Sequence, residues 1–349
     1  MAAPGRRRVA AIDCGTNSLR LLIADIDAAR GELADVQRRM EIVRLGEGVD
    51  ATGRLAPAAL ARTFAMLEEY EQAIVGSAAT AVRVVATSAT RDASNAAEFA
   101  SGVRRILGVD PEVVSGAAEA RLSFSGATAE LGRGTRPGRP GRSGGSGSPG
   151  NGGEPDQPAP PFLVVDIGGG STEFVLGGPE AAAGGNISAI SVDVGSVRLT
   201  ERHLHDDPPA AEQIVAATRD LDAALTAVAE SIPVASANTL VGLAGSVTTL
   251  TAVALNLTEY DPARVHHARL SAARVHEVTA SLLGMDREHR AAIRVIHPGR
   301  VDVIGAGALI LDRIMQRFGF SEMVASEHDI LDGIAWSIVS GAAGVPEPR

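Results

Sequence analysis

The segment VVDIGGGSTEFVLG, residues 164–177, joins two apolar runs through an aspartate, three glycines and a Ser-Thr-Glu triplet. Each run is typical of a β-strand, so the segment predicts a hairpin with a tight polar turn. In a Rossmann or P-loop site the glycines lead into a helix whose N-terminus binds the phosphate. Here they lead into a second strand. The turn is therefore expected to bind an oxyanion through its own backbone amides, with glycine allowing positive φ and close approach.

The same pattern occurs near the start of the chain. Aligning Asp13 with Asp166 places DCGTNSLRLLI over DIGGGSTEFVL, so that the aspartate, a glycine and a serine coincide. Either turn alone would more often be a simple tight turn, but a pattern repeated in each half indicates a duplicated domain. We expect the two turns to face each other across a cleft and to grip a phosphate chain. The expected phosphate-binding residues in them are Gly15, Thr16, Asn17, Ser18, Gly168, Gly169, Gly170, Ser171 and Thr172.

The two aspartates, Asp13 and Asp166, end their strands at equivalent points. Two carboxylates that converge on one cleft repel each other unless a cation lies between them. Mg²⁺ is the natural candidate beside a phosphate substrate, so Asp13 and Asp166 are predicted metal ligands. Each aspartate could instead accept N–H bonds from its own turn, and that role is compatible with metal binding.

The composition limits the chemistry that the chain can perform. With 349 residues, 45% of them apolar, it can bury a sizeable core and favours two domains. Its 42 acidic residues exceed its 32 basic ones, which argues against nucleic acid as a general partner. Every basic residue is arginine. The absence of lysine excludes the P-loop lysine, the protein-kinase strand lysine and pyridoxal Schiff bases.

The apolar stretches and the single cysteine favour a cytoplasmic location. Charges or turn residues interrupt each apolar stretch before it reaches the length of a membrane span, so no membrane partner is expected. Cys14 is the only cysteine, which excludes an intramolecular disulfide and favours a reducing, cytoplasmic location; we interpret it as a small apolar filler. A homodimer is compatible with the sequence.

Residues 133–161 are almost entirely Gly, Pro, Ser and charged residues, which predicts a disordered insertion between domains at 1–132 and 162–349. In the first domain we expect strands at 8–14, 18–27, 33–45 and 81–90 and helices at 57–74, 96–107 (capped by Asn95) and 117–131. In the second we expect a hairpin from Phe162, strands at 187–200, 239–246 and 322–326, and helices at 209–230 and 329–341. The last helix is placed to pack back on the first domain.

Further motifs follow in a fixed order. They are SATRD, SGAAEARLSF, GSVRLTE, HPGRVDVI and SEHDILDG, together with GLAGSVTTL, which resembles the nucleoside-side loop of actin-like ATPases, sugar kinases and Hsp70 chaperones. With these motifs the chain resembles the Ppx/GppA family of exopolyphosphatases and guanosine pentaphosphate phosphohydrolases. The resemblance covers nearly all of the chain except 133–161 and is strongest to the short two-domain actinobacterial members. It implies an α/β, actin-like fold of two RNase-H-like domains with the active site between them.

The resemblance also implies Mg²⁺-assisted hydrolysis of the terminal phosphate of polyphosphate, or of the 5′ γ-phosphate of guanosine pentaphosphate, a nucleotide of the stringent response. It assigns Glu119 as general base toward water, Asp166 as a metal ligand, Glu173 as a residue that orders metal or water, and Arg91 as a phosphate clamp. Arg198 and Arg300 are candidates for later phosphates. These roles suit phosphoryl transfer, which depends on positioning and charge neutralisation. Without the resemblance, the favourable interaction of an acid with the helix dipole in a first helical turn is the preferred explanation of Glu119.

Exopolyphosphatase is the first prediction and guanosine pentaphosphate phosphohydrolase the alternative. A base and ribose pocket would separate the two, and the sequence does not disclose one. A polyphosphate- or nucleotide-binding sensor of low or no activity, and an actin-like kinase or filament protein, are hypotheses from other classes. The segment SEHDILDG replaces a glycine-leucine-arginine-glutamate run that is often found near the family's C-terminus, and GLAGS varies the usual third loop. Both departures bear on substrate preference.

Overall fold

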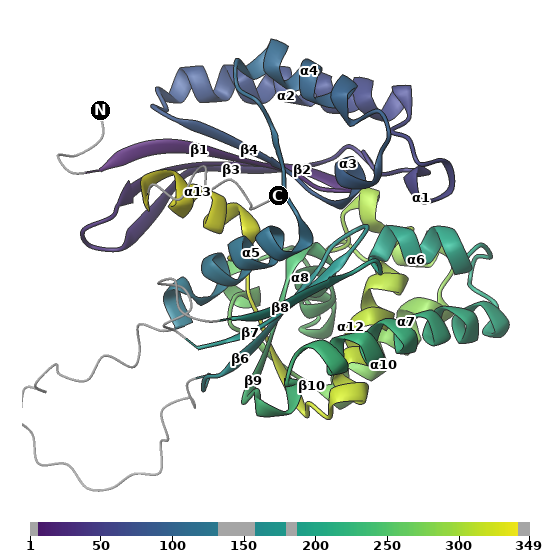
Figure 1. The fold of residues 1–349 in the computed structure, drawn as a ribbon. Helices are drawn as coiled ribbons and strands as arrows, with labels where there is room; N and C mark the ends of the chain where they lie inside the picture. The colour runs from purple at the N-terminus through teal and green to yellow at the C-terminus, as the bar shows by residue number, and fades with distance from the viewer. Residues whose placement is uncertain (1–5, 132–157, 179–186, 341–349) are drawn as a thin grey trace, which may run out of the picture.

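The computed structural model describes residues 6–131, 158–178 and 187–340. Within these residues two β-sheets lie in separate lobes, and helices α5 and α13 lie between them (Figure 1). The disordered insertion expected at 133–161 lies outside the described residues, apart from 158–161. No helix in the described ranges is both long and apolar enough to cross a membrane.

The first sheet has the strand order β3-β2-β1-β4-β5. Its strands are β1 (Arg7–Cys14), β2 (Ser18–Asp27), β3 (Glu32–Ile42), β4 (Val82–Ala86) and β5 (Glu112–Val113), of which the first three form an antiparallel meander and the last two run parallel to β1. α2 (Pro57–Ser77) and α4 (Ala96–Leu107) cover one face, and α13 (Ile330–Ser340) covers the other. Because both faces are covered, the central parts of β1 (residues 9–12) and β2 (residues 21–24) are continuous apolar runs. Cys14 lies in this core and is 1% exposed.

The second sheet has the order β10-β11-β9-β6-β7-β8. Its strands are β6 (Phe162–Ile167), β7 (Thr172–Gly177), β8 (Ser188–Val192), β9 (Thr239–Leu243), β10 (Arg269–Ser271) and β11 (Glu322–Ala325). Apart from the edge strand β10, order and direction repeat those of the first sheet. The duplicated α/β fold predicted from the repeated aspartate-glycine turn is confirmed.

The remaining helices connect and cover the sheets. α5 (Gly116–Leu131) packs on one face of the second sheet, while α7 (Ala211–Ser231), α8 (Ala244–Ala254), α10 (Ala272–Gly284) and α12 (Ile304–Phe318) contribute to the core on its other face. Shorter helices are α1 (Val49–Thr52), α3 (Ser88–Asp92), α6 (Ser196–His203), α9 (Pro262–Val265) and α11 (Arg287–Ala291), with 3₁₀ turns at Val234–Ser236 and Pro298–Arg300.

Several predicted boundaries are wrong. The strand expected at 81–90 ends at Ala86, the one at 187–200 ends at Val192, and the one at 239–246 ends at Leu243; each is followed by a short loop or directly by a helix. In all three cases small and β-branched residues continue a strand-like pattern into a helix that tertiary contacts stabilise. Asn95 precedes α4, but its side chain does not cap that helix. It bonds instead to the backbone of Leu55, accepting from N at 2.8 Å and donating to O at 3.1 Å.

Helices α5 and α13 exchange lobes. α5 follows the first sheet in sequence but packs on the second, and α13 does the reverse. The two helices cross at Gly126 and Gly333. A Cβ on Gly126 would lie 1.9 Å from the carbonyl oxygen of Asp329, and one on Gly333 would lie 2.0 Å from that of Leu122. We propose that each domain consists of one sheet and the helices that pack on it, so that α13 belongs to the first domain and α5 to the second.

The close crossing of α5 and α13 predicts that one added methyl group at Gly126 lowers the stability of the protein strongly. We expect Gly126→Ala to lower the free energy of unfolding by about 3 kcal/mol, because a side chain cannot fit without moving the backbone of α13. Gly76→Ala is the control: Gly76 is exposed in α2 with nothing within 4 Å of an added Cβ, and alanine there should stabilise by about 0.5–1 kcal/mol. Urea denaturation followed by circular dichroism measures both changes. Equal effects of the two substitutions would contradict the close crossing.

Candidate active site

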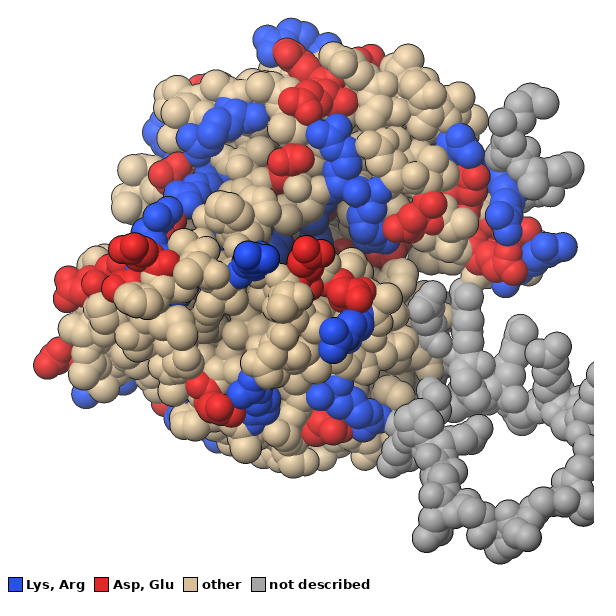
Figure 2. All heavy atoms as spheres, turned by 180° about the vertical axis from the view of Figure 1, so that it is seen from behind, with Lys and Arg blue, Asp and Glu red and all other residues tan. Residues whose placement is uncertain are grey.

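A narrow cavity of about 70 Å³ lies where the β1–β2 turn of one lobe meets the β6–β7 turn of the other. Seen from behind, the surface is hollowed between the lobes, with basic side chains beside the hollow (Figure 2). Both predicted turns contribute to the cavity wall, and so do predicted acidic residues from α5 and from the strand ends. The predicted residues that line it are Asp13, Gly15, Thr16, Asn17, Ser18, Glu119, Asp166, Gly168, Gly169 and Ser171.

The two turns have the same internal geometry. Gly15 N donates to Ser18 O at 3.0 Å, and Gly168 N donates to Ser171 O at 3.0 Å. The expectation of positive φ is wrong for Gly15 and for the glycines at 168–170, none of which adopts it. Close approach accounts for these glycines instead. A Cβ on Gly168, for example, would lie 3.0 Å from Ser171 O.

The tips of the two turns contact each other across the lobes. A Cβ on Gly169 would lie 2.9 Å from Cβ of Thr16, and one on Gly170 would lie 2.7 Å from Oγ of Ser88. Thr16 and Ser88 also share a hydrogen bond of 2.9 Å between their hydroxyls. Gly170 thus packs between residues of the first lobe and is not among the residues that line this cavity.

Neighbouring segments hold the carbonyl groups of both turns. In the second lobe, Gly168 O accepts from Ser196 N at 2.9 Å and Gly169 O accepts from Val197 N at 2.8 Å, at the start of α6. Because a peptide is planar and trans, the N–H groups that follow these carbonyls, those of Gly169 and Gly170, point away from α6. The first turn is held in the same way, since Thr16 O and Asn17 O accept from backbone amides of residues 43–46.

Two predicted phosphate-binding side chains are engaged elsewhere. The hydroxyl of Thr172 donates to Val194 O at 2.6 Å, away from the cavity. Arg91 does not line the cavity; its Nη1 donates to Glu119 Oε2 at 3.2 Å and to Val114 O at 3.0 Å. In this structure Arg91 therefore positions the acid rather than facing the cavity itself.

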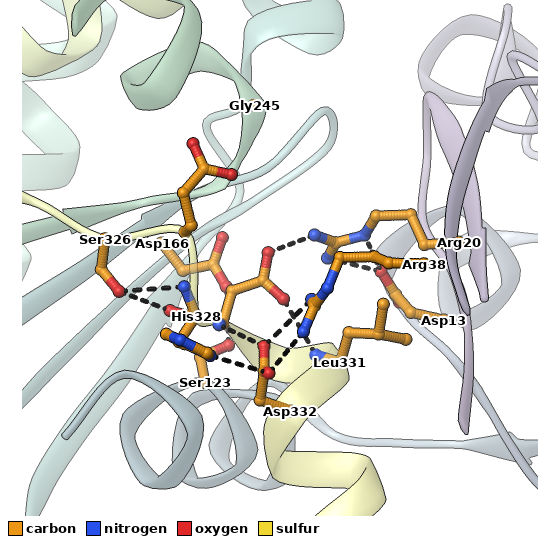
Figure 3. A network of polar contacts seen from close by, with 12 residues as sticks. Asp13, Arg20, Arg38, Ser123, Asp166, Gly245, Ser326, His328, Leu331 and Asp332 are labelled. Carbon is orange, nitrogen blue, oxygen red and sulfur yellow. Dashed lines mark hydrogen bonds and ion pairs between the residues drawn. The ribbon is translucent and has the colours of Figure 1, made fainter. Parts of the chain in front are cut away.

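Arg20 lies between carboxylates at the cavity wall (Figure 3). Its Nη2 and Nε donate to Asp13 Oδ2 at 2.7 and 2.9 Å, and its Nη1 pairs with Asp329. Ser123 Oγ donates to Asp166 Oδ2 at 2.6 Å. A metal cation was expected beside Asp13 and Asp166, and the guanidinium of Arg20 already places a positive charge beside Asp13.

The aspartates also fit a metal ion. Asp13 Oδ1 is buried and has no hydrogen-bond partner among the described residues, so one oxygen of the predicted ligand is available. No group of three or more His, Cys, Asp or Glu among the described residues is arranged to hold a metal. Mg²⁺ is commonly held by one or two carboxylates, with water and substrate phosphate oxygens completing its shell, and this donor set fits that pattern.

Burial raises the pKa values of the acids around the cavity. Glu119 is 8% exposed, and burial together with Glu173 raises its pKa well above the ordinary value although Arg91 opposes the shift. Glu173 lies behind the cavity wall, where its Oε1 accepts from Ser191 Oγ at 2.7 Å, and burial followed by Asp166 raises its pKa to about 8. Burial and then Asp329 raise the pKa of Asp166 to about 6. Several buried carboxylates with raised pKa values around one cavity are typical of a functional site.

Several residues that line the cavity were not predicted as site residues. Ser88, Ser196, Ala244, Gly245 and Ser246 lie in motifs that the sequence singled out without assigning these residues a role. Arg20 and Thr87 also line the cavity, and Ser123 supports Asp166 from behind. Two signals were available. Arg20 is a charge that interrupts the apolar run 19–24 of strand β2, and Ser123 lies four residues after Glu119, on the same face of α5.

A second cavity, of about 510 Å³, adjoins the first and shares Arg20, Ala244, Gly245 and Arg300 with it. Arg300 donates to Gly245 O at 3.0 Å and to Thr249 Oγ1 at 3.1 Å, and it makes no ion pair within the described part of the chain. The remaining lining combines cations with apolar and aromatic groups and two carboxylates, among them Arg38, Arg39, Met40, Tyr260, Arg294, Val295, His297, Pro298, Leu331, Glu327 and Asp329. Arg198 lines neither cavity and pairs with Asp50 and Asp92 of the first lobe.

Comparisons with known proteins identify relatives over nearly the whole chain. The family model described as "Ppx/GppA phosphatase family" matches residues 22–137 and 156–341. "Exopolyphosphatase 2" of Mycobacterium tuberculosis is 47% identical over 342 residues, which cover 95% of this chain and 98% of that protein. "Guanosine-5'-triphosphate,3'-diphosphate pyrophosphatase" of Aeromonas salmonicida is 27% identical over 95% of this chain and 59% of its own length. The solved structure of the Aquifex aeolicus PPX-GPPA enzyme matches with a TM-score of 0.73 and 31% identity, covering 95% of this chain and 99% of that one. The chain therefore belongs to the Ppx/GppA phosphatase family.

Proposed function

We propose that this protein is an exopolyphosphatase that removes the terminal phosphate of inorganic polyphosphate by Mg²⁺-assisted attack of water. The observation that carries the proposal is the meeting of two phosphate-type turns from separate lobes at one cavity, which Glu119 also lines. The Mycobacterium tuberculosis relative named for this activity is 47% identical over nearly the whole chain. The relative named for the guanosine nucleotide is more distant, at 27%.

Substrate binding is assigned to the turns and to Arg300. The carbonyl groups of Gly168 and Gly169 accept hydrogen bonds from α6, so the N–H groups of Gly169 and Gly170 point away from α6. We assign the N–H group of Gly169 to the phosphate. Arg300, which has only neutral partners among the described residues, supplies a positive charge between the two cavities. The small cavity suits the terminal phosphate, and the larger one suits the rest of the chain.

Glu119 is assigned as the general base. As water attacks the terminal phosphorus, a bond forms between the water oxygen and phosphorus, and the bond to the bridging oxygen of the next phosphate breaks. The proton of the water passes to Glu119, and the shortened chain leaves with the bridging oxygen. Arg91 holds the carboxylate at 3.2 Å, and a pKa above the ordinary glutamate value makes it a stronger base.

The divalent metal is assigned to Asp13 Oδ1 and Asp166. When bound, Mg²⁺ neutralises the charge of the phosphate oxygens, which is the main requirement of phosphoryl transfer. The chain's own contribution is to keep these two carboxylates in place: Arg20 fixes the other oxygen of Asp13, and Ser123 fixes Oδ2 of Asp166.

One observation favours guanosine pentaphosphate as a second candidate substrate. The larger cavity contains Tyr260 and apolar side chains such as Met40 and Val295 beside its arginines. Aromatic and apolar surfaces bind a nucleobase, whereas a polyphosphate chain needs only the cations. Both substrates would undergo the same cleavage in the smaller cavity.

Glu119→Gln tests the catalytic assignment. Glutamine keeps the shape but cannot accept a proton, so phosphate release from polyphosphate should fall by about 10²- to 10⁴-fold while binding is retained. Glu112→Gln is the control, because Glu112 is exposed on β5 and lines neither cavity. Unchanged release by Glu119→Gln would contradict the role of the base. Binding by the wild-type protein without any release would support the sensor hypothesis instead.

A comparison of substrates tests the preference and the metal together. We expect orthophosphate release from polyphosphate to exceed release from guanosine pentaphosphate, and both to be lost in EDTA and restored by Mg²⁺. Tyr260→Ala should reduce release from the nucleotide alone if its base binds in the larger cavity. Faster release from the nucleotide, lost in Tyr260→Ala, would make guanosine pentaphosphate the substrate. Release that persists in EDTA would contradict the metal assignment.

Glu173→Gln should stabilise the metal-free protein as the pH rises. The pKa of Glu173 is about 8 in the folded state against an ordinary 4.5, so its stabilising contribution is full below pH 4.5 and is lost as the pH rises through 8. Glutamine does not titrate, and the variant should gain on the wild type by at most about 1.4 kcal/mol per pH unit in this window. Urea denaturation in EDTA between pH 5 and 8 measures the difference, with Glu112→Gln as the control. Parallel pH profiles for wild type and Glu173→Gln would show that Glu173 is not held protonated.

A further inference from the structure

Asp329 places an additional carboxylate on an arginine of the active site. It lies directly before α13, is 5% exposed, and pairs through Oδ2 with Nη1 of Arg20. Arg20 uses its Nε and Nη2 for Asp13. Arg20 lines both cavities and Asp329 lines the larger one, so an anion of the protein already engages Arg20 at the cavity that the two residues share.

The other oxygen of Asp329 has a separate, structural task. Asp329 Oδ1 accepts from Leu331 N at 3.0 Å, and Asp329 N donates to Asp332 Oδ2 at 3.1 Å, so the two aspartates cap the start of α13 reciprocally. Asparagine and serine cap a helix about as well as aspartate. The helix therefore needs an oxygen at this position but does not need a negative charge.

The charge of Asp329 opposes anions at the site. It lies close enough to the predicted metal ligands to raise the pKa values of both Asp13 and Asp166. A phosphate group that approaches Arg20 meets the same repulsion and must also share or replace the Asp329 ion pair. A ligand with several phosphates can offset this loss through Arg300 and the two turns at once, whereas a single orthophosphate cannot.

We propose that Asp329 is a specificity-determining residue that competes with phosphate groups for Arg20, so that the site retains phosphate chains and rejects orthophosphate. The ion pair breaks as a chain binds and re-forms as the cleaved phosphate leaves. This inference rests on the proposed function only in taking a phosphate chain as the ligand. It adds a role for a carboxylate that neither holds the metal nor accepts a proton from water.

Asp329→Asn isolates the charge, because the cap is kept. We expect the dissociation constant for tripolyphosphate to fall roughly tenfold, and that for orthophosphate to fall by a larger factor, measured by isothermal titration calorimetry in EDTA to prevent turnover. In turnover assays with Mg²⁺, KM should fall, and inhibition by orthophosphate should strengthen. Asp286→Asn is the matched control, because Asp286 caps α11 through His289 N at 2.9 Å and lines neither cavity. It should change none of these values.

Asp329→Ser keeps the proposal testable if the asparagine variant folds poorly, because serine is a second capping residue without charge. Melting temperatures of all variants establish folding. Unchanged or weaker binding of tripolyphosphate by a folded Asp329→Asn or Asp329→Ser protein would overturn the inference, and so would tighter binding in Asp286→Asn. Tighter tripolyphosphate binding in a protein that hydrolyses no polyphosphate would support the competition and contradict only the proposed function.

Discussion

The crossing of α5 and α13 is the constraint on which the site depends. At Gly126 and Gly333 the two backbones approach so closely that neither position has room for a Cβ. The same two helices carry polar groups to the cavity. α5 contributes Glu119 to its wall and Ser123 to Asp166, and the residue before α13, Asp329, reaches Arg20. Separation of the helices by even an added methyl group would therefore move acids of both lobes at once.

Asp13 and Asp166 lie at equivalent positions of the duplicated fold, but their hydrogen-bond donors differ in charge. Asp166 accepts from the hydroxyl of Ser123, a neutral donor on α5, whereas Asp13 accepts from the guanidinium of Arg20, which pairs in turn with Asp329. One oxygen of Asp13 remains buried without a partner among the described residues. The two turns are related by the repeat, but the carboxylates of Asp13 and Asp166 are not equivalent. Only the donor of Asp13, Arg20, is shared with a further carboxylate, that of Asp329.

The sequence was sufficient for the fold because the decisive signals are local. The spacing of aspartate, glycine and serine in the two turns predicted the duplicated sheets, and their strand orders agree. Several roles at the site depend on long-range contacts and could not be predicted. Arg20 meets Asp329 from a position 309 residues away in the chain, and Arg91 meets Glu119 rather than the cavity. The glycines of the turns were expected to need positive φ, but close approach requires them instead. Gly15 and Gly168 approach a carbonyl of their own turn, whereas Gly169 and Gly170 approach the opposite lobe, which no local pattern records.

The presence of arginine rather than lysine matters at position 20. A guanidinium has several donors in a fixed plane, so Arg20 can hold Asp13 through two nitrogens and Asp329 through a third. A lysine ammonium is a compact charge and could not bridge the two carboxylates in the same fixed geometry. Other arginines join the lobes at the rims of the cleft: Arg202 Nε lies 2.7 Å from Asp50 Oδ2, and Arg44 Nη2 lies 2.8 Å from Asp302 Oδ2. The larger cavity, which shares Arg20 and Arg300 with the smaller one, therefore adjoins the buried acids at a point where a guanidinium already bridges two carboxylates.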